Sequence, residues 1–152
     1  MAAGRVGAHV SVVGAIVVVA VLVVATVVGL GMRARTGRVR TTTPSASSGW
    51  TVAHVTPEPD DRVLLLQLSS PICTPCRQTA AQLTELAARR PGLRHVEIDV
   101  ADEPGAAATL RVMRTPTTIA FARDGRELLR VSGVPRRQDL LEALDTELAG
   151  QP

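Results

Sequence analysis

Aromatic residues and lysine are scarce or missing in this sequence. Trp50 and Phe121 are its only aromatic residues, and all 17 of its basic side chains are arginines. A hydrophobic core must therefore be built from leucine, valine, isoleucine and alanine. The chain offers no aromatic platform for base stacking and no basic stripe in its C-terminal two thirds, so we expect no nucleic acid among its partners.

Acidic residues are absent from the first third of the chain. Residues 1–49 carry five arginines and no acid, whereas residues 50–152 carry twelve arginines and fourteen acids, a net charge of 12 − 14 = −2. The high pI of about 10.0 therefore comes from the N-terminal region. The remaining ~100 residues are enough for one compact domain, which we expect to be monomeric.

Cysteine is also scarce, because Cys73 and Cys76 are the whole supply. A separate structural disulfide is excluded, which argues against a small secreted fold held together by disulfides. The count by itself does not fix the redox compartment.

Charged side chains are missing from Val6 to Met32, where His9 is the only titratable residue. A helix over residues 10–32 would be about 34 Å long, enough to cross a hydrocarbon core of about 30 Å. The alternative is a cleaved signal peptide, whose apolar core is usually about 7–15 residues long and precedes a small-residue cleavage site. Because this run is longer and Arg33 follows it directly, we expect a short N-terminal segment (residues 1–9) and an uncleaved, single-pass transmembrane helix (residues 10–32).

Arginines are concentrated on one side of this span. Arg5 precedes it, and four arginines follow within eight residues: Arg33, Arg35, Arg38 and Arg40. The positive-inside rule then favours a C-terminal domain on the cytoplasmic face of the cell membrane, and a domain that faces outward stays open as the alternative. Residues 33–49 are expected to be a basic flank and a flexible tether, because their Thr, Ser, Pro and Gly residues have little apolar surface to pack.

Strand and helix patterns alternate through residues 50–152, which we expect to form the folded domain. The expected strands are residues 50–55, 62–69, 93–100, 117–122 and 127–131, and the expected helices are residues 75–90, 102–112 and 136–149. This order predicts an α/β fold in which a central parallel sheet carries an antiparallel hairpin at its edge and helices on both faces.

Local signals mark the ends and faces of these elements. Pro91-Gly92 should end the first helix, Asp102 should cap the second, and Asp124-Gly125 should form the hairpin turn. Asp99 is expected to be a turn or cap residue. The expected buried faces consist of Cys76, Ala80, Leu83 and Ala87 in the first helix and of Leu140, Leu141, Leu144 and Leu148 in the last.

The motif that carries chemistry is Cys73-Thr74-Pro75-Cys76, at the junction of a buried strand and a helix. The first turn of a helix presents unpaired N–H groups and a partial positive charge, which stabilise a thiolate and lower its pKa. The spacing of three residues puts Cys76 within disulfide range of Cys73. Cys73 would be the exposed nucleophile and Cys76 the shielded resolving thiol, while Pro75 fits a first turn that needs no N–H from it.

Two other interpretations of the cysteines stay open. A zinc site needs four ligands, and His54 and His95 have no ligand spacing to the pair, so we expect no metal. The cysteines could also be buried and inert. A redox pair in a strand-to-helix turn is the interpretation that the pattern favours.

The residues around this pair resemble the thioredoxin superfamily over residues 62–148. The resemblance is carried by Val63-Leu64-Leu65-Leu66-Gln67-Leu68, Cys73-Thr74-Pro75-Cys76-Arg77, His95-Val96-Glu97-Ile98-Asp99, Thr115-Pro116-Thr117, Asp124-Gly125 and Gly133. It implies a three-layer fold with a central mixed sheet. It also implies that Thr115 and Pro116, joined by a cis bond, lie beside the cysteines and help to receive the substrate chain.

The departures from this family concern the surroundings of the cysteines. Thioredoxins usually have Trp before the first cysteine, where this chain has Ile72, and Gly-Pro between the pair, where it has Thr74-Pro75. Gln67 occupies the position of the buried thioredoxin acid, and His95 that of its partner lysine. The resemblance therefore implies the fold and the thiol chemistry but not full reductase strength.

Two further residues have alternative roles. Trp50 is expected to anchor the start of the domain rather than to bind a ligand. His95 is expected to be structural, with a proton shuttle as the alternative.

The function we expect is that of a membrane-tethered thiol–disulfide oxidoreductase. Thiolate Cys73 attacks a target disulfide, and Cys76 then releases the reduced target; the reverse sequence oxidises a dithiol. No cofactor is needed beyond the Cys73–Cys76 disulfide, and the partners are protein substrates and an upstream thiol reductant. The alternative is a tethered docking module that uses the same groove without turnover.

Overall fold

The structure is a computed structural model that describes residues 4–35, 39–40 and 48–149. Contacts divide the chain into an N-terminal helix and a C-terminal domain. Most of the expected tether, residues 36–38 and 41–47, and the first three residues of the expected N-terminal segment lie outside the described residues.

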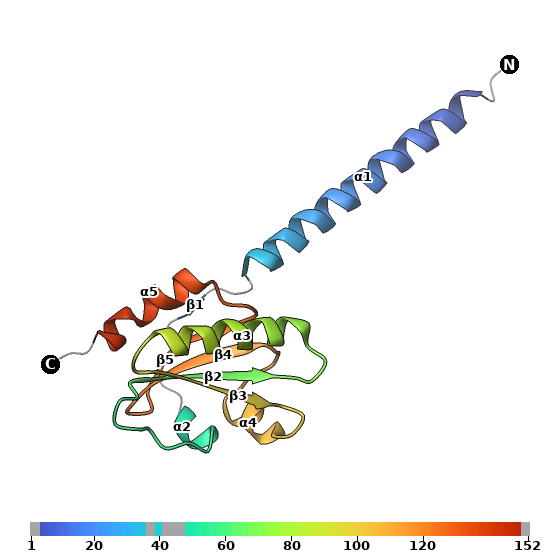
Figure 1. Cartoon of the computed structure of the whole chain (residues 1–152). Coiled ribbons are helices and arrows are strands. Elements are labelled where there is room, and N and C mark those ends of the chain that lie inside the picture. Colours follow the sequence, from blue (N-terminus) through green and yellow to red (C-terminus); the bar gives the residue numbers. More distant parts are fainter. Residues whose placement is uncertain (1–3, 36–38, 41–47, 150–152) are drawn as a thin grey trace. The chain divides into compact units, whose positions relative to one another are not determined.

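Helix α1 (Gly4–Arg35) is continuous over 32 residues and extends beyond the expected span at both ends (Figure 1). Its stretch Gly14–Gly31 has a mean hydropathy of 2.7, and none of it is buried. A run of valines becomes helical in lipid because every backbone polar group must be paired within the segment. The helix is therefore long and apolar enough to cross a membrane, a test that a signal sequence near an N-terminus would also pass.

Over the described residues, the domain is built on a five-stranded mixed sheet in the order β1-β5-β4-β2-β3. The strands are β1 (Val39–Arg40), β2 (Val63–Ser69), β3 (Leu93–Asp99), β4 (Thr117–Ala122) and β5 (Glu127–Ser132). Strands β2 and β3 are parallel, and the other neighbouring pairs are antiparallel. The mixed sheet that the resemblance implied is confirmed. The parallel centre predicted from the element order is corrected, because among the described strands β2 pairs antiparallel with β4 and parallel only with β3.

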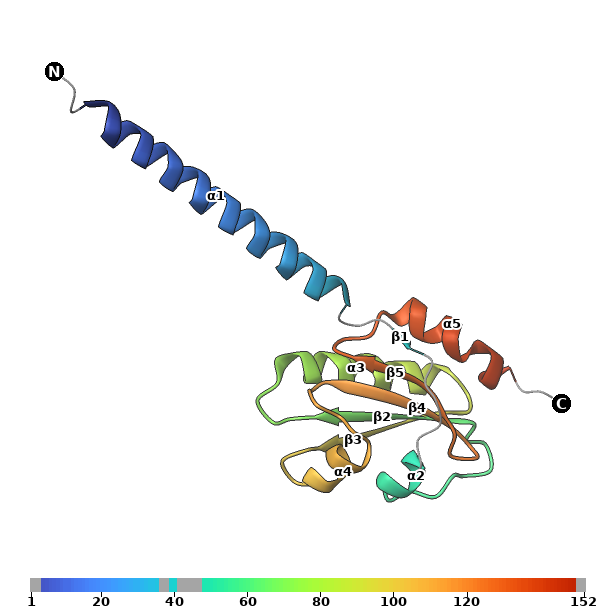
Figure 2. The same ribbon diagram turned by 180° about the vertical axis from the view of Figure 1, so that it is seen from behind.

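Helices cover both faces of the sheet and complete the three layers, as Figures 1 and 2 show. Helices α3 (Thr74–Arg89) and α5 (Arg137–Leu148) lie on one face, and α2 (Gly49–Val52) and α4 (Pro104–Thr109) lie on the other. The three-layer α/β architecture is therefore confirmed.

Strand β2 is the centre of the core, and all seven of its residues are buried. Its side chains alternate between the two faces: Leu64, Leu66 and Leu68 join the cluster with α2 and α4, whereas Val63 and Leu65 join the cluster with α3 and α5. Each fully buried leucine contributes about 1.5–3 kcal/mol to folding. The end of β2 is thus held rigidly where the cysteine turn (residues 70–76) begins.

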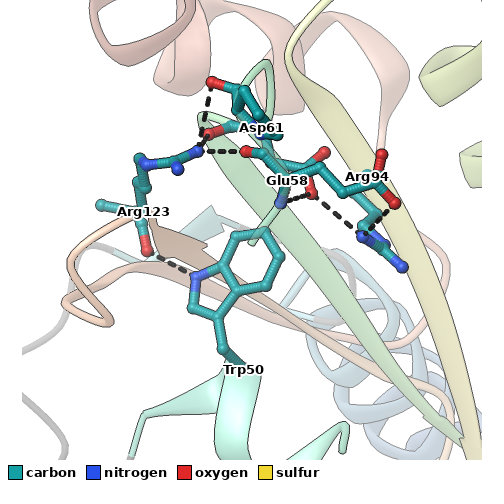
Figure 3. A network of polar contacts seen from close by, with 7 residues as sticks. Trp50, Glu58, Asp61, Arg94 and Arg123 are labelled. Atoms are coloured by element: carbon teal, nitrogen blue, oxygen red, sulfur yellow. Dashed lines mark hydrogen bonds and ion pairs between the residues drawn. The ribbon is translucent and has the colours of Figure 1, made fainter. Parts of the chain in front are cut away.

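The segment predicted as a first strand, residues 50–55, instead begins in the short helix α2, so that prediction is wrong. The indole N–H of Trp50 donates to the carbonyl of Ala122 over 2.8 Å, and the side chain is only 3% exposed (Figure 3). Gly49 packs so closely on Phe121 that an added Cβ would lie 2.0 Å from its ring. Trp50 is therefore the structural anchor that we expected. The edge strand of the sheet on this side is β1, which pairs with β5.

Two arginines fix the loop that leads from α2 into β2 (Figure 3). Arg123 donates to the carbonyl oxygens of Glu58 and, over 2.7 Å, Asp61, while Arg94 pairs with the Asp61 carboxylate at 3.0 Å. Such partly exposed pairs contribute about 0–1 kcal/mol each. The loop lies at the start of β2, the end of the strand away from the cysteines.

The helix boundaries differ from expectation in detail. The buried face of α3 consists of Cys76, Thr79, Leu83 and Leu86, so Ala80 and Ala87 are less buried than predicted. Asp102 does not cap α4: the residue at the N-cap is Glu103, and the helix ends at Thr109, before the expected Val112.

The predicted hairpin turn and the predicted role of Asp99 are confirmed. Gly125 adopts a φ of +88°, a conformation that favours glycine, between β4 and β5. Asp99 accepts a hydrogen bond from the backbone N–H of Ala101 over 2.8 Å. Leu140 and Leu144 of α5 are fully buried, and Leu141 and Leu148 pack against them in part.

Candidate active site

The cysteine pair lies at the junction of β2 and α3. The backbone N–H of Cys73 donates to the carbonyl of Ser70 over 3.2 Å, which closes the turn after β2. Cys73 is extended, with a φ of −93°, and occupies the N-cap of α3. Pro75 lies in the first turn, where no hydrogen bond is required from its nitrogen. The predicted strand-to-helix placement is therefore observed.

Cys73 and Cys76 form a disulfide with their Cα atoms 5.2 Å apart. The backbone N–H of Cys76 donates to Sγ of Cys73 over 3.1 Å. Cys76 is buried, with 1% of its surface exposed, whereas Cys73 is half-buried. The two sulfur atoms thus differ in access, and the more accessible one is at the positive end of a helix of 16 residues.

The loop that contains Thr115 and Pro116 is tied to the cysteine turn. The Thr115–Pro116 bond is cis, as the family resemblance implied. The hydroxyl oxygens of Ser70 and Thr115 are 3.3 Å apart, and the carbonyl of Pro116 accepts a hydrogen bond from Gly133 over 2.7 Å. Pro116 is buried and Thr115 half-buried.

Two large apolar side chains are almost fully exposed on these connected loops. Ile72 immediately precedes Cys73, and Met113 lies three residues before Pro116; each is 94% exposed. Each of the two loops therefore presents one large apolar side chain to solvent.

Gln67 is fully buried beneath the pair and uses its amide nitrogen twice. Nε2 donates to the carbonyl of Cys76 over 3.0 Å and to Oε1 of Glu97 over 3.1 Å. Its own oxygen, Oε1, has no hydrogen-bond partner among the described residues. Sequence reasoning placed Gln67 beneath the pair but did not find Glu97.

The expected neighbour of Gln67 was His95, and this is corrected by the strand register. In the parallel pair, His95 lies opposite Leu65, and Glu97 lies opposite Gln67. His95 instead shares a hydrogen bond with Oγ1 of Thr84 on α3, at 3.1 Å. A signal for Glu97 was available, because it is two residues beyond His95 and therefore on the same face of β3.

His95 is a partly buried histidine whose Nε2 has no partner among the described residues. Burial lowers the pKa of His95 from its ordinary value of about 6.5, and the negative charge of Glu97 offsets this only in part. The structural role that we expected fits this environment.

We expect the domain to lose stability as the pH falls below about 6.5, because unfolded chains then bind a proton that folded His95 resists. His95→Gln removes this term. The full chain in detergent should therefore show a smaller drop in the domain's Tm between pH 7.5 and pH 5.5 when it carries His95→Gln. Equal drops in the two proteins would contradict this account.

No group of three or more His, Cys, Asp or Glu residues that could hold a metal ion occurs within residues 4–35, 39–40 and 48–149. The chemistry at hand is that of the two sulfur atoms. A half-accessible disulfide at a helix N-terminus, on a three-layer α/β fold with a neighbouring cis-proline loop, defines the class of thiol–disulfide oxidoreductases.

Comparison with known proteins gives the same class. The family model for thioredoxin matches residues 52–146. Thioredoxin from Staphylococcus aureus is 39% identical over 77 residues, which cover 50% of this chain and 73% of that protein. The structure of Fasciola hepatica thioredoxin superposes with a TM-score of 0.51 at 27% identity, covering 58% of this chain and 83% of the other.

A thioredoxin mutant from Halobacterium salinarum, at 23% identity and a TM-score of 0.53 over 60% of this chain and 80% of the other, supports the fold alone. The chain belongs to the thioredoxin family. Proteins of this family need no cofactor beyond the redox-active disulfide, and this chain is a thiol–disulfide oxidoreductase.

Proposed function

We propose that the protein is a membrane-tethered reductase of protein disulfides. In the reduced protein, the thiolate of Cys73 attacks a target disulfide and forms a mixed disulfide. Cys76 then attacks Sγ of Cys73, which restores the Cys73–Cys76 disulfide and releases the target as a dithiol. An upstream thiol reductant returns the two electrons to the pair.

The observation that carries this proposal is the difference between the two cysteines. Cys73 is half-buried and receives the N–H of Cys76 over 3.1 Å, a contact that would also stabilise its thiolate. Cys76 is 1% exposed and so meets a disulfide only after Cys73 has brought it in. The assignment of nucleophile and resolving thiol follows from this asymmetry.

The loops beside the pair supply a surface for the target. Thr115 and Pro116 stand next to the cysteine turn through the Ser70–Thr115 contact, and Ile72 and Met113 add exposed apolar area. An extended target segment would lie over this surface with its disulfide at Cys73. Thr74, whose hydroxyl accepts a hydrogen bond from Arg77 over 3.1 Å, and Pro75 hold the shape of the turn.

Insulin reduction tests the proposal and separates it from a docking module without turnover. The full chain in detergent, with dithiothreitol as reductant, should precipitate reduced insulin chains faster than dithiothreitol alone. Cys73→Ser should reduce the rate to that background. A full chain that binds insulin but leaves the background rate unchanged would favour the docking module.

Membrane attachment is proposed from α1, whose central 18 residues have a mean hydropathy of 2.7. The excess of arginine after the span favours a cytoplasmic domain. We therefore expect a C-terminal alkaline phosphatase fusion to be inactive in cells, because that reporter needs disulfides formed outside the cytoplasm. A membrane-bound and active fusion would show that the domain faces outward, and fusion activity released from membranes would indicate a cleaved signal peptide.

A further inference from the structure

Gln67 holds two oxygen atoms close to each other below the cysteine pair. Its Nε2 lies 3.0 Å from the carbonyl oxygen of Cys76 and 3.1 Å from Oε1 of Glu97, so these oxygens are at most about 6 Å apart. An amide does not take up a proton near neutral pH. Gln67 therefore places a carboxylate near Cys76 without serving as a base itself.

A cavity of about 560 Å³ adjoins both residues, and Cys76 and Glu97 are among its lining residues. A water molecule occupies about 30 Å³, so the cavity has room for several. Cys76 is 1% exposed, whereas Glu97 is exposed at the protein surface. The cavity thus joins Cys76 to an accessible carboxylate through a space that water can enter.

We propose that Glu97 accepts the proton of the Cys76 thiol, through one bridging water, in the step that releases the reduced target, and that Gln67 is the positioning residue for this transfer. The proposal rests on the roles of Cys73 and Cys76 proposed above. Glu97, on the edge strand β3, would thus supply the proton acceptor that Gln67 cannot provide.

The step balances in atoms and electrons. The Cys76 S–H bond breaks and its proton passes through the water to Glu97. The Cys76 thiolate attacks Sγ of Cys73, so the bond between the two cysteines forms as the bond from Cys73 to the target sulfur breaks. The target sulfur leaves as a thiolate and takes a proton from solvent. The protein is oxidised and the target disulfide is reduced, with two electrons transferred.

Other charged groups share the environment of Glu97 and bear on its proton affinity. They are Arg77 of α3, His54 after α2, the acids Asp99, Asp102 and Glu103 of the same cavity, and His95 on the same face of β3. In the described part of the chain, none of these groups is hydrogen-bonded to Gln67, whereas Glu97 is. This contact distinguishes Glu97 from the other acids.

The test separates attack from resolution. The reduced full chain in detergent is mixed with a symmetric aromatic disulfide whose halves become coloured thiolates on release. The first release reports the attack of Cys73, and the second reports the attack of Cys76. Glu97→Gln should slow the second release by at least about tenfold at pH 7, since general-base assistance is worth about 10²–10⁴-fold and bulk water replaces part of it. The first release should stay within about twofold.

Two variants and the pH profile exclude a merely structural effect. Glutamine at position 97 still offers an oxygen to the Gln67 amide, so the packing contact is kept. Glu97→Asp should retain most of the second release, and Asp102→Asn, which alters an acid of the same cavity, should match the unmodified chain. The deficit of Glu97→Gln should shrink toward pH 9 as hydroxide takes the proton directly.

A second release that is equal in Glu97→Gln and the unmodified chain from pH 6 to 9 would overturn the proposal. Equal slowing of both releases would also overturn it, because that points to a structural role. If the unmodified chain shows no first release, the proposed function fails, and the role of Glu97 fails with it.

Discussion

Cys76→Ser will convert the protein into a trap for its targets. Cys73 can still attack a disulfide, but the mixed disulfide has no second thiol to resolve it, so turnover should fall by more than about 10³-fold. Because position 76 is 1% exposed, a small thiol that could cleave the mixed disulfide must approach from the side of Cys73. Incubation with insulin, followed by non-reducing gel electrophoresis, should show a covalent adduct that disappears with dithiothreitol.

The matched control is Cys73→Ser. It leaves the buried Cys76 in place and should form no adduct, because Cys76 is not accessible to a protein disulfide. Equal adduct formation by the two variants would mean that the exposure difference does not assign their roles. In that case the order of attack would have to be reversed or abandoned.

Gln67→Glu is expected to change stability and rate in opposite directions. Burial and the nearby negative charge of Glu97 both raise the pKa of a carboxyl introduced at position 67. The folded protein then holds this proton more tightly than the unfolded chain does. Stability should therefore fall as the pH rises from about 4.3 through that raised pKa, by about 2–4 kcal/mol, the cost of an unpaired buried charge.

Resolution by Cys76 should be faster in the same variant above pH 7, by up to about tenfold, because the new base acts without a bridging water. The two-release assay measures the rate, and urea unfolding at pH 6 and pH 8.5 measures the stability. Equal or slower resolution across pH 6–9 in a folded variant would show that position 67 does not govern proton transfer.

An exchange of the two side chains provides the control for this variant. Gln67→Glu combined with Glu97→Gln keeps one amide and one carboxylate in contact but moves the acid inward. It should recover part of the lost stability, because the like charges are no longer paired. A double variant as unstable as Gln67→Glu alone would place the cost in burial rather than in repulsion.

The sequence was sufficient for elements whose position depends on local patterns. The buried leucines of β2 need only a continuous apolar run, and the turn at Gly125 needs only a residue that tolerates a positive φ. Cys73 could be placed at a helix start because a strand pattern ends and a helical pattern begins there. These are the parts of the fold and the site that were predicted correctly.

The remaining features depend on contacts between distant segments. Trp50-Thr51-Val52 has the composition of a strand, yet these residues form helix α2. In this helix the indole of Trp50 donates a hydrogen bond to Ala122, which is 72 residues away in the sequence. The neighbour of Gln67 depends on the register between β2 and β3, two parallel strands that are connected through helix α3. His95 and Glu97 lie on the same face of β3, so the strand pattern alone does not show which of them lies opposite Gln67. The contact between Gln67 and Glu97 was missed for this reason.

Strand β1 covers the outer edge of β5, where Val39 pairs with Val131 and Arg40 with Arg130. An uncovered strand edge presents a row of unpaired backbone groups and is a template for aggregation. A shortened chain that begins at Ser48 would keep the cysteines and the core but would leave β5 open to a second copy. Chains that begin after α1 and before Val39 retain this strand, and they are the better starting point for soluble samples in crystallisation and NMR.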